Sequence, residues 1–344
     1  MLLSEFDFDL PSELIAQEPL AERDASRMLV LDRDTQSWSD SQFKNFTEYL
    51  RSNDVVVVNN SRVIPARLKG KREETGGQVE IFLVRELEPK VWEALVKPGG
   101  RLKRGAKVNF DESRLKAEMI DEPGAELRLV RFHCEGSFDE LLGGIGVTPL
   151  PPYIKRSSSS SADDRERYQT IYAKQRGAIA APTAGLHFTP SVLAEIETRA
   201  TLAEVTLHVG YGTFEPVRVD DVDQHSVSSE RFEISEAAAA KIYNTRCKGG
   251  RVIVVGTTTM RALESSANDE GVVTAGTGEA SLTIKPGYRF RVADALLTNF
   301  HLPQSSLLIL VSAFAGREFI LSAYRHAVSE RYRFYSYGDC MLIL

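Results

Sequence analysis

The residues that most suggest chemistry lie in the segment 181–189, which reads APTAGLHFT. Gly185 frees the backbone beside Thr183 and favours a loop. Thr189 followed by a proline predicts the start of a helix, with the threonine as N-cap. His187 would then lie just ahead of a helix N-terminus, where free N–H groups and the helix dipole favour an anion such as a phosphate or a carboxylate. A packed loop with a core histidine is the alternative interpretation.

Two further histidines follow this loop. The sequence EVTLHVG at 204–210 alternates apolar and polar residues, which predicts a strand that points His208 off its polar face. The glycine-flanked Thr213 and then His225 complete the group. Imidazole titrates near neutral pH, so His187, His208 and His225 are candidate general acids or bases. Zinc is the alternative, but no pair has the close spacing of local ligand motifs and no cysteine lies near them. We therefore predict no metal site.

Other candidate binding residues lie where predicted elements begin or end. The segment GTTTMRALE at 256–264 predicts a helix whose threonines, Thr258 among them, either cap it or bind a substrate anion together with Arg261. Further on, an apolar run ends in Asn299 and His301, so these polar side chains should emerge at a strand end, where ligands of α/β domains usually bind.

Near the C-terminus, RFYSYGDC brings three aromatic residues close to Asp339. Aromatic rings stack on nucleobases, and a carboxylate can accept hydrogen bonds from the N1–H and 2-amino edge of a guanine-like ring. Tyr337 and Asp339 are therefore candidates for binding a base, with a core aromatic cluster as the alternative.

Strands and helices alternate along much of the chain, which predicts an α/β (mixed α+β) main domain. Buried strands are expected at 55–60 and 251–256, and Ser235 should cap a helix over 236–246. We assign residues 1–61 and 151–344 to this discontinuous domain.

The segment 62–150 has a different sequence pattern from the rest of the chain. Short β-rich runs are broken by glycine and proline, and we predict an inserted small β-barrel. Residues 62–107 hold 12 lysines and arginines against 6 acidic residues, a net charge of +6, whereas the whole chain carries −6. A basic module on an acidic body favours a polyanionic partner, and a solvated basic face is the alternative. The densest basic cluster comprises Arg101, Lys103, Arg104 and Lys107.

Composition excludes several other classes of protein. The 344 residues are 42% hydrophobic and 26% charged, close to globular averages. Acidic residues near the N-terminus argue against a signal peptide, and no apolar run approaches the roughly 20 residues that span a bilayer, so we expect no membrane association and a cytoplasmic protein. Three scattered cysteines, Cys134, Cys247 and Cys340, argue against a disulfide framework.

Taken together, these segments resemble the S-adenosylmethionine:tRNA ribosyltransferase-isomerase family of the bacterial queuosine pathway. The resemblance runs almost from end to end, through the blocks LPSELIAQEPL, RDASRMLVL, VVVVNNSRVIPARL, TPLPPYIKR, DRERYQT, APTAGLHFT, TLHVGYGTFEPV, VGTTTMRALE, DALLTNFHLPQSSLLILVSAFAG and YSYGD. These blocks are long and unusual, so they are far more specific than a single glycine motif. They add Asp24, Arg27, Asn60 and Arg62 to the candidate substrate-binding residues.

The resemblance implies an α/β domain with an inserted β-barrel. It also implies that the ribosyl part of S-adenosylmethionine is transferred to 7-aminomethyl-7-deazaguanine at the wobble position of tRNA. Ribose becomes an epoxycyclopentane, epoxyqueuosine-tRNA forms, and adenine and methionine leave. S-adenosylmethionine is then a co-substrate, no further cofactor is needed, and we expect a monomer.

The chain departs from this family where the usual HxMHSE reads HSVSSE, which puts Ser228 in place of the second histidine. Ala280 and Ser281 replace a Thr-Asp pair, and the serine tract 157–161 is unlike the usual loop. The competing hypothesis is a non-catalytic RNA-binding protein in which the basic barrel binds and the histidine loops are structural. It explains the charge shift but not the polar residues gathered in turns of the main domain.

Overall fold

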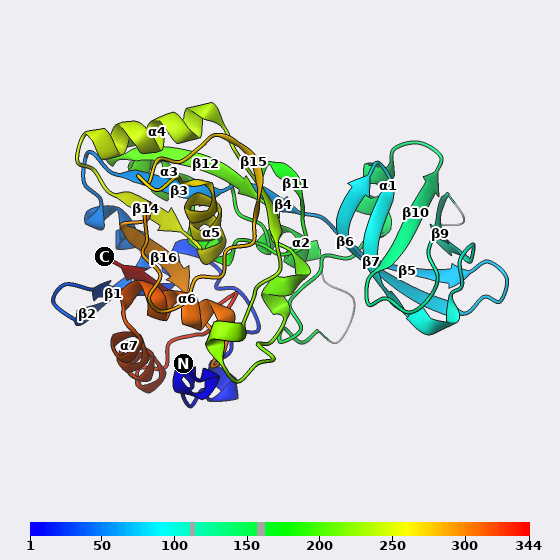
Figure 1. Cartoon of the computed structure of the whole chain (residues 1–344), viewed down its shortest axis with the longest axis horizontal. Helices are drawn as coiled ribbons and strands as arrows, with labels where there is room; N and C mark the ends of the chain where they lie inside the picture. The colour runs from blue at the N-terminus through cyan, green and yellow to red at the C-terminus, as the bar shows by residue number, and fades with distance from the viewer. Residues whose placement is uncertain (111–113, 157–161) are drawn as a thin grey trace.

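The structure is a computed structural model that describes residues 1–110, 114–156 and 162–344. A main domain and a smaller β-barrel lie side by side along the long axis of the molecule (Figure 1). The serine tract 157–161 lies outside the described residues.

A nine-stranded mixed sheet forms the centre of the main domain. In spatial order its strands are β15 (Gly276–Ala280), β13 (Glu230–Ile234), β12 (Thr201–Leu207), β3 (Val55–Asn59), β14 (Val252–Val255), β16 (Ala295–Asn299), β17 (Cys340–Ile343), β1 (Arg27–Asp32) and β2 (Ser37–Gln42). The four central strands β12, β3, β14 and β16 run parallel to one another, and β17 pairs antiparallel with β16. The carboxyl ends of the four parallel strands therefore meet at one edge of the sheet.

Helices cover both faces of this sheet (Figure 1). One face packs against α4 (Glu236–Cys247), α5 (Thr257–Ser266), α6 (Ser306–Ala315) and α7 (Arg317–Ser329). The other face packs against α3 (Pro190–Arg199) and the 3-10 helix η4 (Phe43–Tyr49). Because both faces are buried, the central strands are runs of valine and leucine rather than alternating patterns. The predicted α/β architecture is confirmed.

Helix starts follow the predicted capping pattern. The Thr189 hydroxyl accepts a hydrogen bond from the Val192 N–H and begins α3, with proline in its first turn. Ser235 caps α4 in the same way through the Ala238 N–H. Short 3-10 helices fill the connections: η1 (Leu3–Phe6), η2 (Ser12–Leu14), η3 (Arg23–Ala25), η5 (Gly99–Arg101), η7 (Thr183–His187), η8 (Tyr211–Phe214) and η9 (Val222–Gln224).

The inserted module is a closed antiparallel barrel with its own apolar core. Around the barrel the strands are β10 (Arg128–Cys134), β7 (Val91–Lys97), β6 (Gln78–Glu88), β5 (Arg67–Arg72), β8 (Lys107–Phe110) and β9 (Leu115–Met119). Leu141 and Leu142 of α1 (Phe138–Ile145) belong to the same core. The predicted barrel is confirmed over 67–134, and the outer bounds 62 and 150 stay a prediction.

Two short strands and one helix connect the modules. β4 (Ser61–Val63) pairs parallel with β11 (Gln175–Ala178), and α2 (Ala162–Arg167) precedes β11 in the chain. No single helix in the described parts of the chain has the length and apolar content needed to cross a bilayer. The pair α6 and α7 meets that criterion only together and is bent by 116°.

Candidate active site

Polar side chains gather where the parallel strands end. Asn59 and Asn60 follow β3, His208 follows β12, Thr257 and Thr258 follow β14, and Asn299 and His301 lie at the end of β16. Two cavities open along this edge, and Thr257, Thr258 and Leu307 line both of them. We name them the α5 pocket and the tyrosine pocket.

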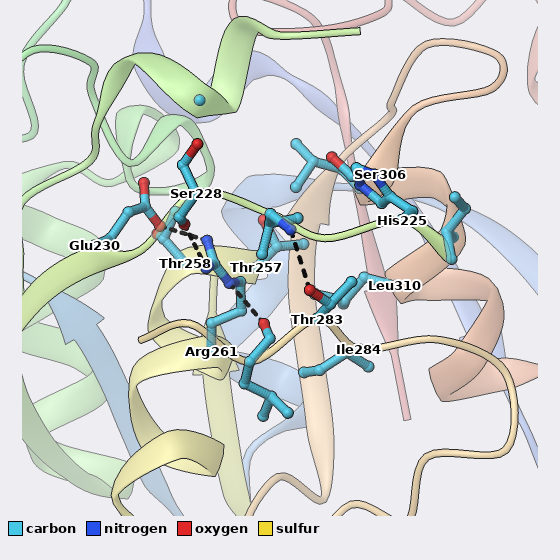
Figure 2. Close-up of a pocket in the computed structure, with 15 residues that line it drawn as sticks. His225, Ser228, Glu230, Thr257, Thr258, Arg261, Thr283, Ile284, Ser306 and Leu310 are labelled. Atoms are coloured by element: carbon cyan, nitrogen blue, oxygen red, sulfur yellow. Dashed lines mark hydrogen bonds and ion pairs between the residues drawn. The ribbon is translucent and has the colours of Figure 1, made fainter. Parts of the chain in front are cut away.

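The α5 pocket has a polar wall and an apolar wall (Figure 2). Its polar residues are His225, Ser228, Glu230, Thr257, Thr258, Arg261, Thr283 and Ser306, and its apolar residues include Val227, Leu282, Ile284, Leu307, Ile309 and Leu310. Its volume is about 540 Å³, part of which is open to solvent. The two walls suit a small molecule with one polar and one apolar part.

Arg261 is held inside the protein rather than free to bind an anion. Its Nη1 lies 2.5 Å from Glu230 Oε2, and its other donors reach the carbonyl oxygens of Ser228, Ala280 and Leu282 (Figure 2). Glu230 also accepts a hydrogen bond from the Gly210 N–H. The pair therefore ties α5 to β13 and shapes the wall of the α5 pocket, which differs from the substrate contact expected for Arg261.

The tyrosine pocket lies on the other side of the α5 N-terminus. Tyr153, Tyr168 and Tyr335 line it together with Thr183, Asn299, His301 and Ser336. Asn299 is 2% exposed and its Nδ2 donates to the Tyr335 carbonyl, but its Oδ1 is buried without a hydrogen-bond partner. The Tyr168 hydroxyl is likewise buried and unpartnered. Buried polar atoms without partners are costly unless water or a ligand completes their hydrogen bonds, which makes Asn299 and Tyr168 candidate ligand contacts.

The N-terminus of α5 lies between the two pockets. Its N-cap residue is Gly256, with φ of 89°, so no side chain caps the first N–H groups of the helix. The unfilled N–H groups and the helix dipole favour a negative charge here. Thr258 lines both pockets, and its contact with a substrate anion stays a prediction, whereas no threonine side chain caps the helix.

The three candidate catalytic histidines do not share one cavity. His225 lines the α5 pocket, and its Nε2 is buried without a partner. Burial and the positive charge of Lys285 lower its pKa, so the imidazole is neutral at pH 7 and free to accept a proton. His187 lines a separate cavity on η7, and His208 lines none of the cavities described.

His187 and His208 both pack closely against their neighbours. His187 Nδ1 lies 2.9 Å from Ser26 Oγ, its ring packs against Phe43, and burial lowers its pKa to about 4. Burial also lowers the pKa of His208, whose ring lies so close to Gly177 that a Cβ there would come within 2.9 Å of Nδ1. The expected position of His187 ahead of α3 is confirmed, but its ring is enclosed.

His301 is the histidine of the tyrosine pocket. Its Nε2 lies 3.1 Å from the Thr298 hydroxyl, and burial lowers its pKa to about 3. It is therefore neutral and held at the base of the cavity.

Several other candidate residues make structural contacts. The Asp339 carboxylate accepts hydrogen bonds from the backbone N–H groups of Arg27 and Arg333, and burial raises its pKa. The Arg27 side chain lies over the Tyr332 ring, 3.7 Å from its centroid, and donates to the Glu330 carbonyl. Both side chains thus connect β1 to the C-terminal segment, whereas a contact with a base was predicted for Asp339 and a substrate contact for Arg27.

Asn60 and Asp24 are also bonded within the protein. Asn60 donates to Glu204 and accepts from Thr206, and Asp24 accepts from Thr189. Arg62 is exposed on β4.

Gly185 is needed for packing, because a Cβ would lie 2.1 Å from the Tyr172 hydroxyl. Thr213 lies in η8, and its side chain is outside the described part of the structure. Tyr337 is 4% exposed with an unpartnered hydroxyl, and it lines the same cavity as His187.

The sequence analysis missed the tyrosine pocket. Tyr153 and Tyr168 come from the segment between the barrel and η7, and they meet Tyr335 only in the folded chain. The signal available was that the matched blocks TPLPPYIKR and DRERYQT each contain one tyrosine. Within the described ranges, no group of three or more histidine, cysteine or acidic side chains is placed to hold a metal ion.

An α/β domain with paired cavities at the carboxyl ends of its strands, joined to a barrel rich in basic residues, defines an enzyme that binds a small molecule beside a larger substrate. The family model described as "Queuosine biosynthesis protein" matches residues 3–343. The chain belongs to the S-adenosylmethionine:tRNA ribosyltransferase-isomerase family of queuosine biosynthesis proteins.

Relatives of the same name cover the whole chain and are themselves covered in full. They come from Pelotomaculum thermopropionicum (51% identical), Acetivibrio thermocellus (50%) and Desulforamulus reducens (49%). The crystal structure of S-adenosylmethionine tRNA ribosyltransferase from Thermotoga maritima is 37% identical and matches with a TM-score of 0.56 over 99% of this chain and 100% of that chain.

Proposed function

We propose that the protein transfers and isomerises the ribosyl part of S-adenosylmethionine onto 7-aminomethyl-7-deazaguanine in the wobble position of tRNA. The products are epoxyqueuosine-tRNA, adenine and methionine. The observation that carries the proposal is the full-length identity of about half to relatives named for this reaction. The paired cavities at the sheet edge support it, since they offer separate places for the two ends of S-adenosylmethionine.

The N-terminus of α5 is the binding site that we propose for the methionine carboxylate. Its uncapped N–H groups provide donors, and Thr258 adds a hydroxyl. Adenine then occupies the tyrosine pocket, where Asn299 Oδ1 can accept from the exocyclic amine and the Tyr168 hydroxyl can donate to a ring nitrogen. In this arrangement the ribose lies beside Thr257 and Thr258, which line both cavities.

His225 is the general base of this proposal. The reaction requires removal of a C5′ proton that the adjacent sulfonium makes acidic, and a neutral imidazole with a free Nε2 can accept it. His187 and His208 then contribute by holding η7 and the end of β12 in place. For the modified base, the aromatic ring of Tyr337 is retained from the sequence prediction, while Asp339 orders the backbone beside it.

The direct test is to incubate the protein with S-adenosylmethionine and tRNA that carries the aminomethyl base, and to measure free adenine. We expect one adenine and one methionine for each modified tRNA, and no loss of turnover after treatment with a chelator. Binding of tRNA without release of adenine would instead support the non-catalytic RNA-binding alternative.

The monomeric state and the cytoplasmic location are also part of the proposal. Light scattering of the free protein should give the mass of one 38.2 kDa chain. A dimer mass would contradict this part without affecting the reaction.

A further inference from the structure

A third cavity, the arginine pocket, lies beside the active site. It is lined by Pro19, Leu20, Glu22, Arg23, Ser26, Arg167, Leu186, His187, Ser336, Tyr337 and Gly338 and has a volume of about 290 Å³, part of it open to solvent. Ser336 lines both this cavity and the tyrosine pocket. The arginine pocket is therefore a neighbour of the proposed adenine site.

The two arginines that line this cavity bond only to carbonyl oxygens. Arg23 donates to the carbonyls of Leu186 and Glu166, at 3.1 and 3.2 Å. Arg167 donates to the carbonyls of Ala21 and Leu20. A third half-buried arginine, Arg333, donates its Nη2 to the carbonyl of Glu18.

Within the described ranges, none of these three guanidinium groups forms an ion pair with a carboxylate, unlike other enclosed arginines. Arg251 lies 2.6 Å from Asp54, and Arg261 is paired with Glu230. Burial lowers the pKa of Arg23, with a further contribution from the charge of Arg167, and burial also lowers the pKa of Arg333. Partly buried positive charges that lack a counter-ion are unfavourable unless a ligand supplies one.

Unpartnered polar atoms face the same place. Arg167 Nε, His187 Nε2 and the Tyr337 hydroxyl are all buried without a hydrogen-bond partner, and each belongs to a residue that lines the cavity. His187 and Tyr337 are each 4% exposed. Arg333 Nη1 is a fourth such atom on the segment that carries Tyr337. Arg167 Nε, Arg333 Nη1 and the Tyr337 hydroxyl can donate a hydrogen bond to an oxyanion, and His187 Nε2 can do so once the imidazole is protonated.

Several carboxyl groups lie near this cluster. The charge of Glu166 acts on Arg23 against the effect of burial, and the charge of Asp164 acts on Tyr337. Glu22 lines the cavity and is exposed, so it can turn toward solvent. Asp339 is bonded to the backbone N–H groups of Arg27 and Arg333 and is already satisfied. Within the described residues, neither Glu22 nor Asp339 forms an ion pair with Arg23 or Arg167, whose guanidinium groups bond to carbonyl oxygens instead.

We propose that the arginine pocket is an oxyanion site that binds a phosphodiester group of the tRNA substrate. Arg23 and Arg167 supply the charge, the Tyr337 hydroxyl supplies a further donor, and His187 Nε2 becomes a donor when the bound anion favours the imidazolium form. Arginine is suited to this role because its planar donors match phosphate oxygens. The tRNA source rests on the proposed function, whereas the oxyanion site rests on the geometry alone. The carboxylate of S-adenosylmethionine is the other source of the same chemistry.

The oxyanion site can be tested without tRNA by titrating the intact protein with inorganic phosphate. We expect the ¹⁵N shift of His187 Nε2 to move on addition of phosphate, and the pKa of His187 to rise, because a bound anion favours the imidazolium form. The Tyr337→Phe variant keeps the ring and loses one donor, so its phosphate affinity should be several-fold weaker. An unchanged His187 signal at saturating phosphate would overturn the proposal.

The source of the oxyanion is tested with the double variant Arg23→Gln/Arg167→Gln. We expect its tRNA dissociation constant to rise about tenfold or more, and the slope of log affinity against log salt to become smaller by about 0.7 to 0.9 for the lost phosphate contact. Its affinity for S-adenosylmethionine should be unchanged. Arg33→Gln is the matched control, because Arg33 is also half-buried and bonded to carbonyl oxygens but lines none of the cavities described.

The outcomes distinguish a tRNA phosphate from the carboxylate of S-adenosylmethionine, and the oxyanion site from the proposed reaction. Weaker binding of S-adenosylmethionine with unchanged tRNA affinity would assign the pocket to the co-substrate and overturn the tRNA assignment. An equal loss of tRNA affinity in Arg33→Gln would show a general structural effect and would also overturn it. If the wild type binds phosphate and tRNA in this way but releases no adenine, the oxyanion site stands and the proposed reaction fails.

Discussion

His225 differs from the other histidines in its surroundings. His187 is enclosed beside Ser26, and His301 is bonded to Thr298, whereas the Nε2 of His225 faces the α5 pocket with no partner. A general base must be neutral, unbonded and in reach of substrate. At the scale of single residues, this contrast makes His225 the histidine whose loss should affect chemistry most.

His225→Ala should lower the single-turnover rate by about 10²- to 10⁴-fold, the usual contribution of a general base. His326→Ala is the control. His326 lies on α7, its imidazole is hydrogen-bonded to Asp40, and it lines none of the described cavities. Since the pKa of His225 is lowered, the wild-type rate should hold through neutral pH and fall only as the pH drops below histidine's ordinary range. A rate for His225→Ala close to that of wild type would place the base elsewhere.

The buried histidines also predict how stability depends on pH. The pKa values of His187 and His301 are lowered to about 4 and about 3, so the unfolded chain takes up protons near pH 6.5 while the folded chain does not. The free energy of unfolding should therefore fall as the pH drops from about 6.5 toward 4.

His301→Gln removes one of these titrations. Between pH 7.5 and 4.5 its free energy of unfolding, measured with urea, should decline by about 2 kcal/mol less than that of wild type. Equal declines in both proteins would mean that His301 does not stay neutral in the folded state.

At the scale of elements, α5 depends on a glycine at its start. Gly256 has φ of 89° and ψ of 145°, a conformation that residues with a Cβ rarely adopt, and it turns the chain from β14 directly into the helix. Gly316 has nearly the same conformation as the N-cap of α7, with φ of 92° and ψ of 130°. The two glycines therefore differ in location rather than in backbone strain.

Gly256→Ala and Gly316→Ala should each lower the free energy of unfolding by roughly 1–3 kcal/mol. Only Gly256→Ala should also weaken the binding of S-adenosylmethionine, by about 3- to 10-fold, because the first N–H groups of α5 then move away from the carboxylate. Calorimetric titration measures the affinity. If both variants bind equally well, the methionine carboxylate does not lie at this helix start.

At the scale of the whole molecule, the barrel carries basic residues away from the sheet edge. Lys103, Arg104 and Lys107 are exposed around a turn at Gly105, and no carboxylate is recorded within ion-pair distance of any of them in the described structure. Lys116, by contrast, is paired with Glu73 at 2.9 Å. Exposed unpaired cations on a separate module are suited to contact a nucleic-acid backbone.

Neutralising Lys103, Arg104 and Lys107 to glutamine should weaken tRNA binding and leave the affinity for S-adenosylmethionine unchanged. Each lost phosphate contact should reduce the salt slope by about 0.7 to 0.9, measured by tRNA titration at several salt concentrations. Lys116→Gln is the control and should keep the wild-type slope. An unchanged slope in the triple variant would show that this cluster is a solvated face.

The amino-acid sequence by itself determined the class of fold and the positions of the polar loops. Valine-rich runs, the caps at Thr189 and Ser235, and the glycine-broken barrel segment are local signals, so they could be interpreted without knowing the contacts. The same is true of Thr258, Asn299 and His301 at strand and helix ends, and of the family, which long blocks identify.

Only the tertiary structure decided which polar residues are free to bind a substrate. Arg261, Arg27 and Asp339 have the right chemistry, but residues distant in sequence occupy their hydrogen bonds. Conversely, Tyr168, Arg23 and Arg167 line cavities because segments from both ends of the chain meet there. Hydrogen-bond partners are set by long-range packing, and a donor left unpartnered in a cavity cannot be recognised from the residues around it in the sequence.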